Sequence, residues 1–152
     1  MGRRIVTLLL AISILVIGVP AVAQDGEKVL VVVNASNDVK SVDAAMVKNF
    51  YLGSSSYWAN GQRVAVFQRG EESPASKAFF SKVLKMAPSR FRHHWQTLEL
   101  SGQGVAPENA GTAAAIIGKV AGKAGGIGFI LESERELTAA NAKVRVIELV
   151  AE

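Results

Sequence analysis

The chain has 152 residues, no cysteine, 17 basic against 13 acidic side chains, and a formal net charge of +4. The lack of cysteine excludes disulfides, thiolate metal sites and thiol nucleophiles. The basic residues form no run and do not alternate with aromatic residues, so we expect no nucleic-acid partner.

The first 23 residues have the order of a secretory signal peptide. Arg3 and Arg4 precede an apolar run, which ends at the small-residue sequence Ala21-Val22-Ala23. A permanent membrane anchor is the alternative, but the run is short for a membrane span. We therefore expect residues 1–23 to be cleaved, and residues 24–152 to form one domain in the periplasm or otherwise outside the cytoplasm.

The first predicted elements of this domain are a strand and a helix. Residues 29–33, VLVVV, form a continuous apolar run that is typical of a strand buried on both faces, and the turn-forming residues 34–38 end it. Ser41 can cap a helix over residues 42–52. Gly53 can then end this helix in a left-handed conformation.

A loop over residues 54–61 leads to a second strand, residues 63–68. The next segment, QRGEESPASKAFF at residues 68–80, turns the strand into a helix that begins at Pro74. Large apolar residues of this helix are expected to face inward: Phe79, Phe80, Val83 and Leu84.

The second half of the chain continues the alternation. A helix begins at Pro88 and carries three apolar residues at helical spacing, which are Phe91, Trp95 and Leu98. Thr112 can cap a helix over residues 113–121, and residues 125–131 and 144–149 are further strands.

Strands that alternate with helices indicate an α/β domain. We expect a mixed, mostly parallel sheet flanked by helices. The charged residues 132–142 are expected to form an exposed connection.

Residues 69–76 have the features of an oxyanion site. Ser73 is a natural N-cap and Pro74 a natural first residue of a helix, whose first-turn N–H groups carry a partial positive charge. The hydroxyls of Ser73 and Ser76 can add donors, and Arg69 can bind the same oxygens with its guanidinium. The carboxyl end of a strand is also where open α/β sheets bind ligands.

The same residues also fit a plain capped helix. Ser73 can serve its own helix, and Arg69 can pair with Glu71 or Glu72. These two carboxylates would repel an anion unless they turn outward. The residues alone leave both interpretations open.

Other chemistry is not expected. His93 and His94 are neighbours that point apart on a helix, and no further ligand lies at a suitable spacing, so we predict no metal site. No Ser-His-Asp set or carboxylate pair can be assigned, which argues against an enzyme. The glycines of residues 125–128 precede a strand rather than follow one, so we expect no dinucleotide cofactor.

Short motifs follow one another in a fixed order over most of residues 29–131. They are VVN with Ser36, NFYLG followed by Trp58 and Gly61, VFQR with Ser73 and Phe79-Phe80, Phe91 with Trp95, SGQG at residues 101–104, and GGIGFI at residues 125–130. This series resembles the phosphate-type substrate-binding proteins of ABC transporters, in a short form.

The resemblance implies a domain of the periplasmic-binding-protein type II class. The larger members of that class hold phosphate between two lobes and deliver it to a membrane permease. In them an arginine that leaves a strand precedes a Ser-Gly-Thr helix start. Arg69 and Ser73 match this pattern, whereas Pro74 and Ala75 replace Gly-Thr.

The resemblance also implies that the loop after the first strand lines the site, which adds Asn34 and Ser36 as candidates. Residues 24–152 are long enough for about one lobe. Closure over a ligand would then require a second copy of the chain, in a homodimer, or another protein.

Two hypotheses follow. The first is an exported, non-enzymatic solute-binding protein for phosphate or a similar oxyanion, with a permease or another envelope protein as partner. The second is a single-lobe interaction or assembly module that binds a protein and no solute. Glu71, Glu72 and the Pro74-Ala75 replacement favour the second, and an exposed Tyr57-Trp58 loop could provide its contact.

Overall fold

The computed structural model describes residues 27–150, so the expected signal peptide lies outside the described residues. Among residues 27–150, no helix has both the length and the apolar character that crossing a membrane demands. The strands are β1 (Val29–Asn34), β2 (Val42–Asp43), β3 (Ala65–Arg69), β4 (Glu108–Gly111), β5 (Gly126–Leu131), β6 (Val144–Ile147) and β7 (Leu149–Val150). The helices are α1 (Ala44–Tyr51), α2 (Pro74–Phe79) with a π-helical continuation (Phe80–Leu84), α3 (Pro88–Leu100), α4 (Ala113–Ala121), a 3₁₀ turn (Glu132–Glu134) and α5 (Glu136–Ala139).

Five strands form the main sheet, in the order β4-β3-β5-β1-β6. β3 pairs in parallel with β4 and β5, whereas β1 pairs antiparallel with β5 and β6. Four strands therefore point one way and β1 runs against them. This confirms the predicted mixed, mostly parallel α/β sheet. Every residue of β1 and β5 is buried, as the apolar run at residues 29–33 predicts.

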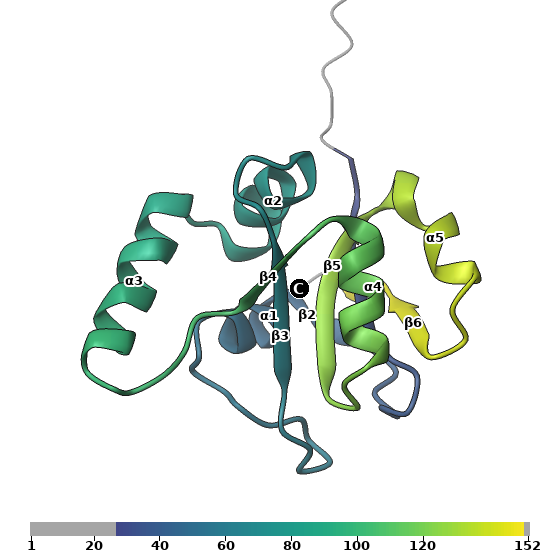
Figure 1. Ribbon diagram of the computed structural model, residues 1–152, viewed down its shortest axis with the longest axis horizontal. Helices are drawn as coiled ribbons and strands as arrows, with labels where there is room; N and C mark the ends of the chain where they lie inside the picture. The colour runs from purple at the N-terminus through teal and green to yellow at the C-terminus, as the bar shows by residue number, and fades with distance from the viewer. Residues whose placement is uncertain (1–26, 151–152) are drawn as a thin grey trace, which may run out of the picture.

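Helices cover both faces of the sheet, because alternate side chains of each strand point to opposite faces. On one face Leu30 and Val32 of β1 pack in a cluster with Ile116 and Val120 of α4. Figure 1 shows α4 in front of the sheet beside β5, and α3 at the left of the molecule. The other face carries the larger cluster, which contains most of the aromatic residues: Phe50, Tyr51, Trp58, Phe79, Phe80, Phe91, Trp95 and Phe129.

Local structure differs from the sequence prediction in several places. The strand expected over residues 144–149 is divided into β6, in the main sheet, and β7, which pairs with β2. α1 is capped by Asp43 rather than Ser41, since the Asp43 carboxylate accepts a hydrogen bond from the Met46 N–H at 2.6 Å. Residues 42–43 do not enter the helix but form β2, which pairs with β7. Residues 132–142 were expected to form an exposed charged connection, and within them the structure has the 3₁₀ turn and α5. β4 was not predicted, because its sequence ENAG has little strand propensity.

The strand directions decide which residues can share a site. Arg69 ends β3 at the same edge of the sheet where β5 ends with Leu131. β1 runs the other way and pairs Val29 with Leu131, so Asn34 at its end lies at the opposite edge. Arg69 and Asn34 are therefore separated by about the length of a strand.

Candidate functional site

Ser73 is the N-cap of α2, as predicted. Its backbone is extended (φ −66°, ψ 145°), and its Oγ accepts a hydrogen bond from the Ser76 N–H at 3.1 Å. The Lys77 N–H donates to the Ser73 carbonyl at 3.0 Å. That bond is the ordinary first bond of the helix, but the Ser73 N–H also donates to the Gly70 carbonyl at 3.0 Å. Two N–H groups expected to face an anion, those of Ser73 and Ser76, are therefore engaged at the helix start itself.

Ser76 connects the start of α2 to the end of β3. Its side chain is fully buried, and its Oγ donates to the Arg69 carbonyl at 3.2 Å. This contact holds Ser73, Ser76 and Arg69 together at one edge of the sheet, where the sequence predicts them to lie.

The guanidinium of Arg69 is paired with a residue that the sequence analysis did not identify. Arg69 Nη1 donates to both carboxylate oxygens of Glu134, at 2.8 and 2.6 Å. The two side chains are only 10% and 22% exposed. Glu134 also accepts from the Leu131 N–H at 2.9 Å, so the turn after β5 holds it in place. Glu134 belongs to the segment that was expected to be an exposed connection. Nothing in the sequence around it distinguishes Glu134 from the neighbouring acidic residues as the partner of Arg69.

Arg69 nevertheless keeps donor capacity. Its Nε is buried and has no hydrogen-bond partner within residues 27–150. A buried N–H without a partner costs free energy, and most such groups in proteins are paired. The Nε atom therefore keeps an unused donor at this edge of the sheet, which an acceptor reaches only if the groups that bury it move aside.

Glu71 and Glu72 do not pair with Arg69. Glu72 lies 3.2 Å from Lys77 and Glu71 lies 3.6 Å from Arg92, and both are surface pairs. The two carboxylates thus turn outward, which is the arrangement that an anion beside Arg69 requires.

Asn34 and Ser36 are not part of this cluster. Asn34 Nδ2 donates to the carbonyls of Val120 and Ala121 at 2.9 and 3.1 Å, while its Oδ1 accepts from the N–H and Oγ of Ser36 at 2.9 and 2.7 Å. Asn34 therefore caps the carboxyl end of α4 at the opposite edge of the sheet. The structure brings Arg69, Ser73 and Ser76 together, and it separates Asn34 and Ser36 from them.

The remaining polar and aromatic candidates have structural partners or are exposed. His94 Nε2 lies 2.8 Å from the Leu52 carbonyl, while His93 is on the surface. No three His, Asp or Glu side chains within residues 27–150 are grouped so that they could hold a metal ion. Of the expected contact loop, Tyr57 is 59% exposed, but Trp58 is buried and donates to the Gly125 carbonyl at 3.0 Å.

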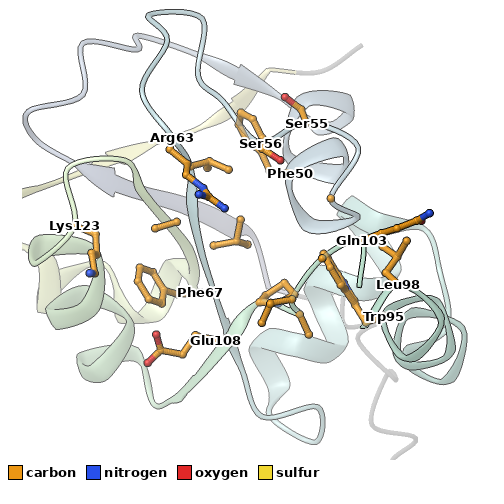
Figure 2. A pocket seen from close by; sticks show the side chains of 18 residues that line it. Phe50, Ser55, Ser56, Arg63, Phe67, Trp95, Leu98, Gln103, Glu108 and Lys123 are labelled. Carbon is orange, nitrogen blue, oxygen red and sulfur yellow. The ribbon is translucent and has the colours of Figure 1, made fainter. Parts of the chain in front are cut away.

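A separate cavity of about 400 Å³ lies between β3, α3 and the segment that leads to β4. Figure 2 shows side chains that line it, including Arg63, Phe67, Trp95 and Lys123. Arg69, Ser73 and Ser76 are not among them. No sequence pattern predicts this cavity, because its walls come from segments far apart in the chain.

Comparison with solved structures finds proteins with the same fold. An ABC-type phosphate transport receptor from Vibrio cholerae matches with a TM-score of 0.58 and 17% identity, over 83% of this chain and 48% of that chain. PstS from Borrelia burgdorferi matches with a TM-score of 0.62 and 9% identity, over 82% and 48%. A possible phosphate binding protein from Planctomyces limnophilus matches with a TM-score of 0.57 and 12% identity, over 82% and 42%.

These likenesses confirm the predicted resemblance at the level of the fold. The chain spans about half the length of the solved proteins it matches. No protein-family model matches the chain, and no curated protein matches it.

Proposed function

We propose that this chain is an exported, non-enzymatic solute-binding protein whose ligand is phosphate or a similar oxyanion, with Arg69 at the centre of its site. The fold supports this proposal, because it is shared with proteins described as phosphate receptors and phosphate-binding proteins. Export to the periplasm and delivery to a permease rest on the sequence of residues 1–23 and on the resemblance.

The observation that carries the proposal is the unpaired Nε of Arg69. Arginine binds oxyanions through two neighbouring N–H groups, and here Glu134 engages only Nη1. The Nε side of the guanidinium therefore has an unused donor for a ligand oxygen, which binds there once the groups that bury Nε move aside. The Ser73 hydroxyl lies at the start of α2, whose partial positive charge favours an anion.

Glu134 sets a limit on affinity. Its carboxylate neutralises the charge of Arg69 and already occupies the Nη1 side of the guanidinium. Phosphate therefore has to bind beside this carboxylate or displace it. A lone lobe also leaves the anion in contact with water, which weakens each contact. We therefore propose that a second copy or another envelope protein closes over this edge when binding is tight.

Calorimetric titration with phosphate tests the proposal, with sulfate as the comparison ligand. Residues 1–152 are expressed, and the form that the cell produces from them is purified. We expect saturable heat that is absent in Arg69→Ala. Glu134→Gln should bind phosphate about tenfold more tightly, because it removes the competing negative charge and retains the shape of the side chain.

A second candidate function is favoured by the Arg69–Glu134 pair itself. If that pair is a permanent structural contact, the same edge serves as the surface of a single-lobe module that binds a protein partner. Pro74, which lacks an N–H, fits this alternative. Two results together would support it: no phosphate heat from a folded sample at millimolar phosphate, and no gain of binding in Glu134→Gln.

A further inference from the structure

The cavity of about 400 Å³ beside β3 is separate from the cluster of Arg69, Ser73 and Ser76, and the proposed phosphate binding assigns no role to it. Its volume is within the range of small-molecule pockets. Residues 63–67 form its floor, α3 forms one wall, and residues 103–108 form another. This makes the cavity a candidate site for a second kind of ligand.

One side of the cavity is apolar and rigid. The Trp95 ring lies between two glycines: a Cβ atom added at Gly53 would lie 2.8 Å from the ring, and one added at Gly104 would lie 3.1 Å from it. The indole Nε1 donates to the Tyr51 carbonyl at 3.0 Å, which fixes the ring orientation. Leu98 lines the same side, and Val105 is 83% exposed at its rim.

The other side carries positive charge. Arg63 and Lys123 both line the cavity, and neither has an ion pair or a side-chain hydrogen bond within the described part of the chain. The turn after α4 is packed closely on β3, since a Cβ atom added at Gly125 would lie 1.9 Å from the Arg63 carbonyl oxygen. In Figure 2, Arg63 lies at the top with its guanidinium directed toward the middle, Lys123 lies at the left, and Trp95 and Leu98 lie at the right.

Glu108 is the one acidic residue in the lining, and it pairs with Lys119. Its charge is therefore balanced from outside the cavity. The lining as a whole combines two unpaired cations with an apolar wall. An inorganic oxyanion would leave that wall unused, whereas a neutral apolar molecule would leave the two cations unused.

We propose that this cavity binds a small amphipathic carboxylate, such as an aromatic ring on a short acid chain. The ring packs against Leu98 and against the small part of Trp95 that faces the cavity, since Trp95 is 6% exposed. The carboxylate accepts hydrogen bonds from Arg63 and Lys123. A ring with a two- or three-carbon acid chain fits the volume. The site is independent of the proposed phosphate site, because the two share no residue.

Nuclear magnetic resonance with 3-phenylpropionate as the probe tests this proposal on the protein expressed from residues 1–152. The chain has two tryptophans, so their indole N–H signals are readily told apart by substitution. We expect the Trp95 signal to shift saturably with a dissociation constant of about a millimolar or tighter, and to shift more than that of Trp58, which does not line the cavity.

Three test variants, one control variant and one analogue locate the contacts. Arg63→Ala and Lys123→Ala, both at exposed positions, should each weaken binding by about tenfold. Val105→Asp should weaken it similarly, by placing a carboxylate at the apolar rim. Lys143→Ala is the matched control at another exposed lysine and should leave binding unchanged. The neutral analogue 3-phenylpropionamide should bind at least tenfold more weakly.

Three results would overturn the proposal: no Trp95 shift at about 10 mM probe, equal binding of the amide, or binding that both cation variants leave unchanged. The Arg69→Ala variant should bind 3-phenylpropionate normally. The two proposals can therefore fail separately, because phosphate with Arg69→Ala tests one site, whereas 3-phenylpropionate with Arg63→Ala and Lys123→Ala tests the other.

Discussion

Arg69 Nη1 donates to both carboxylate oxygens of Glu134, at 2.8 and 2.6 Å, and so joins the end of β3 to the turn that follows β5. The two strands are parallel neighbours, and their backbone pairing includes only Ala65 and Val66 of β3. The side-chain pair therefore connects the ends of β3 and β5, where the two strands have no backbone pairing with each other.

Glu134→Ala should lower the free energy of unfolding by about 1–3 kcal/mol, because Arg69 is nine-tenths buried and would lose its partner. The Leu131 N–H would lose its acceptor as well. Urea denaturation followed by circular dichroism measures the change. Glu136→Ala, at an exposed position two residues away, should shift stability by less than about 0.5 kcal/mol. Equal effects of the two variants would contradict a stabilising role for the pair.

Asn34→Ala should destabilise the fold by about 1–3 kcal/mol, because the carbonyls of Val120 and Ala121 lose a buried donor. Phosphate binding by the folded protein should remain as in the wild type, since Asn34 lies at the other edge of the sheet from Arg69. Thermal melting and calorimetric titration of one sample give both values. Loss of binding without loss of stability would return Asn34 to the list of ligand contacts.

Gly53→Ala should destabilise the protein more than Gly61→Ala. Both glycines have positive φ, 72° and 79°, so both substitutions carry a backbone cost of about 1 kcal/mol. Only at Gly53 would the added Cβ also contact a core side chain, 2.8 Å from the Trp95 ring, whereas Gly61 has open space. The clash should add about 1–3 kcal/mol and change the tryptophan fluorescence. Equal destabilisation of the two variants would mean that Trp95 can move aside.

Tyr51 should make the fold sensitive to alkaline pH. Burial raises the pKa of its hydroxyl well above the ordinary value of 10.0, because the charged form is not solvated. Its contribution to stability is therefore fully present below about pH 10 and is lost as the pH rises from there toward the folded-state pKa.

The Tyr51→Phe variant tests this pH dependence. It should lose about 1 kcal/mol at neutral pH, since the Phe67 carbonyl loses a hydrogen bond of 2.7 Å. Its stability should then fall less between pH 9 and pH 11 than that of the wild type. Tyr57→Phe, at the exposed tyrosine, serves as the control. If the stabilities of Tyr51→Phe and the wild type fell in parallel with rising pH, Tyr51 would not be the cause of the alkaline sensitivity.

Local signals in the sequence were sufficient for much of the fold. The apolar run at residues 29–33 predicts a buried strand, Ser73-Pro74 predicts the start of α2, and Thr112 predicts the start of α4; the structure confirms all three. Each of these signals depends on residues within one turn or one strand, so no knowledge of distant contacts is needed.

The partners of the candidate site residues could not be predicted in the same way. Glu134 is one of several acidic residues after β5, and only the packing of β3 beside β5 brings it to Arg69. Asn34 was placed at the site by analogy, and the antiparallel direction of β1 moves it to the other edge. The cavity beside Trp95 likewise depends on three segments that meet only in the folded chain.

The position of β1 also has a consequence for folding kinetics. β1 comes first among the described strands, yet its sheet neighbours, β5 and β6, begin only at Gly126 and Val144. During synthesis its five apolar residues remain without their strand partners until residues 126–147 have been made. Contacts over such long sequence separations slow folding, so the nascent chain should stay open and available to chaperones until late in synthesis.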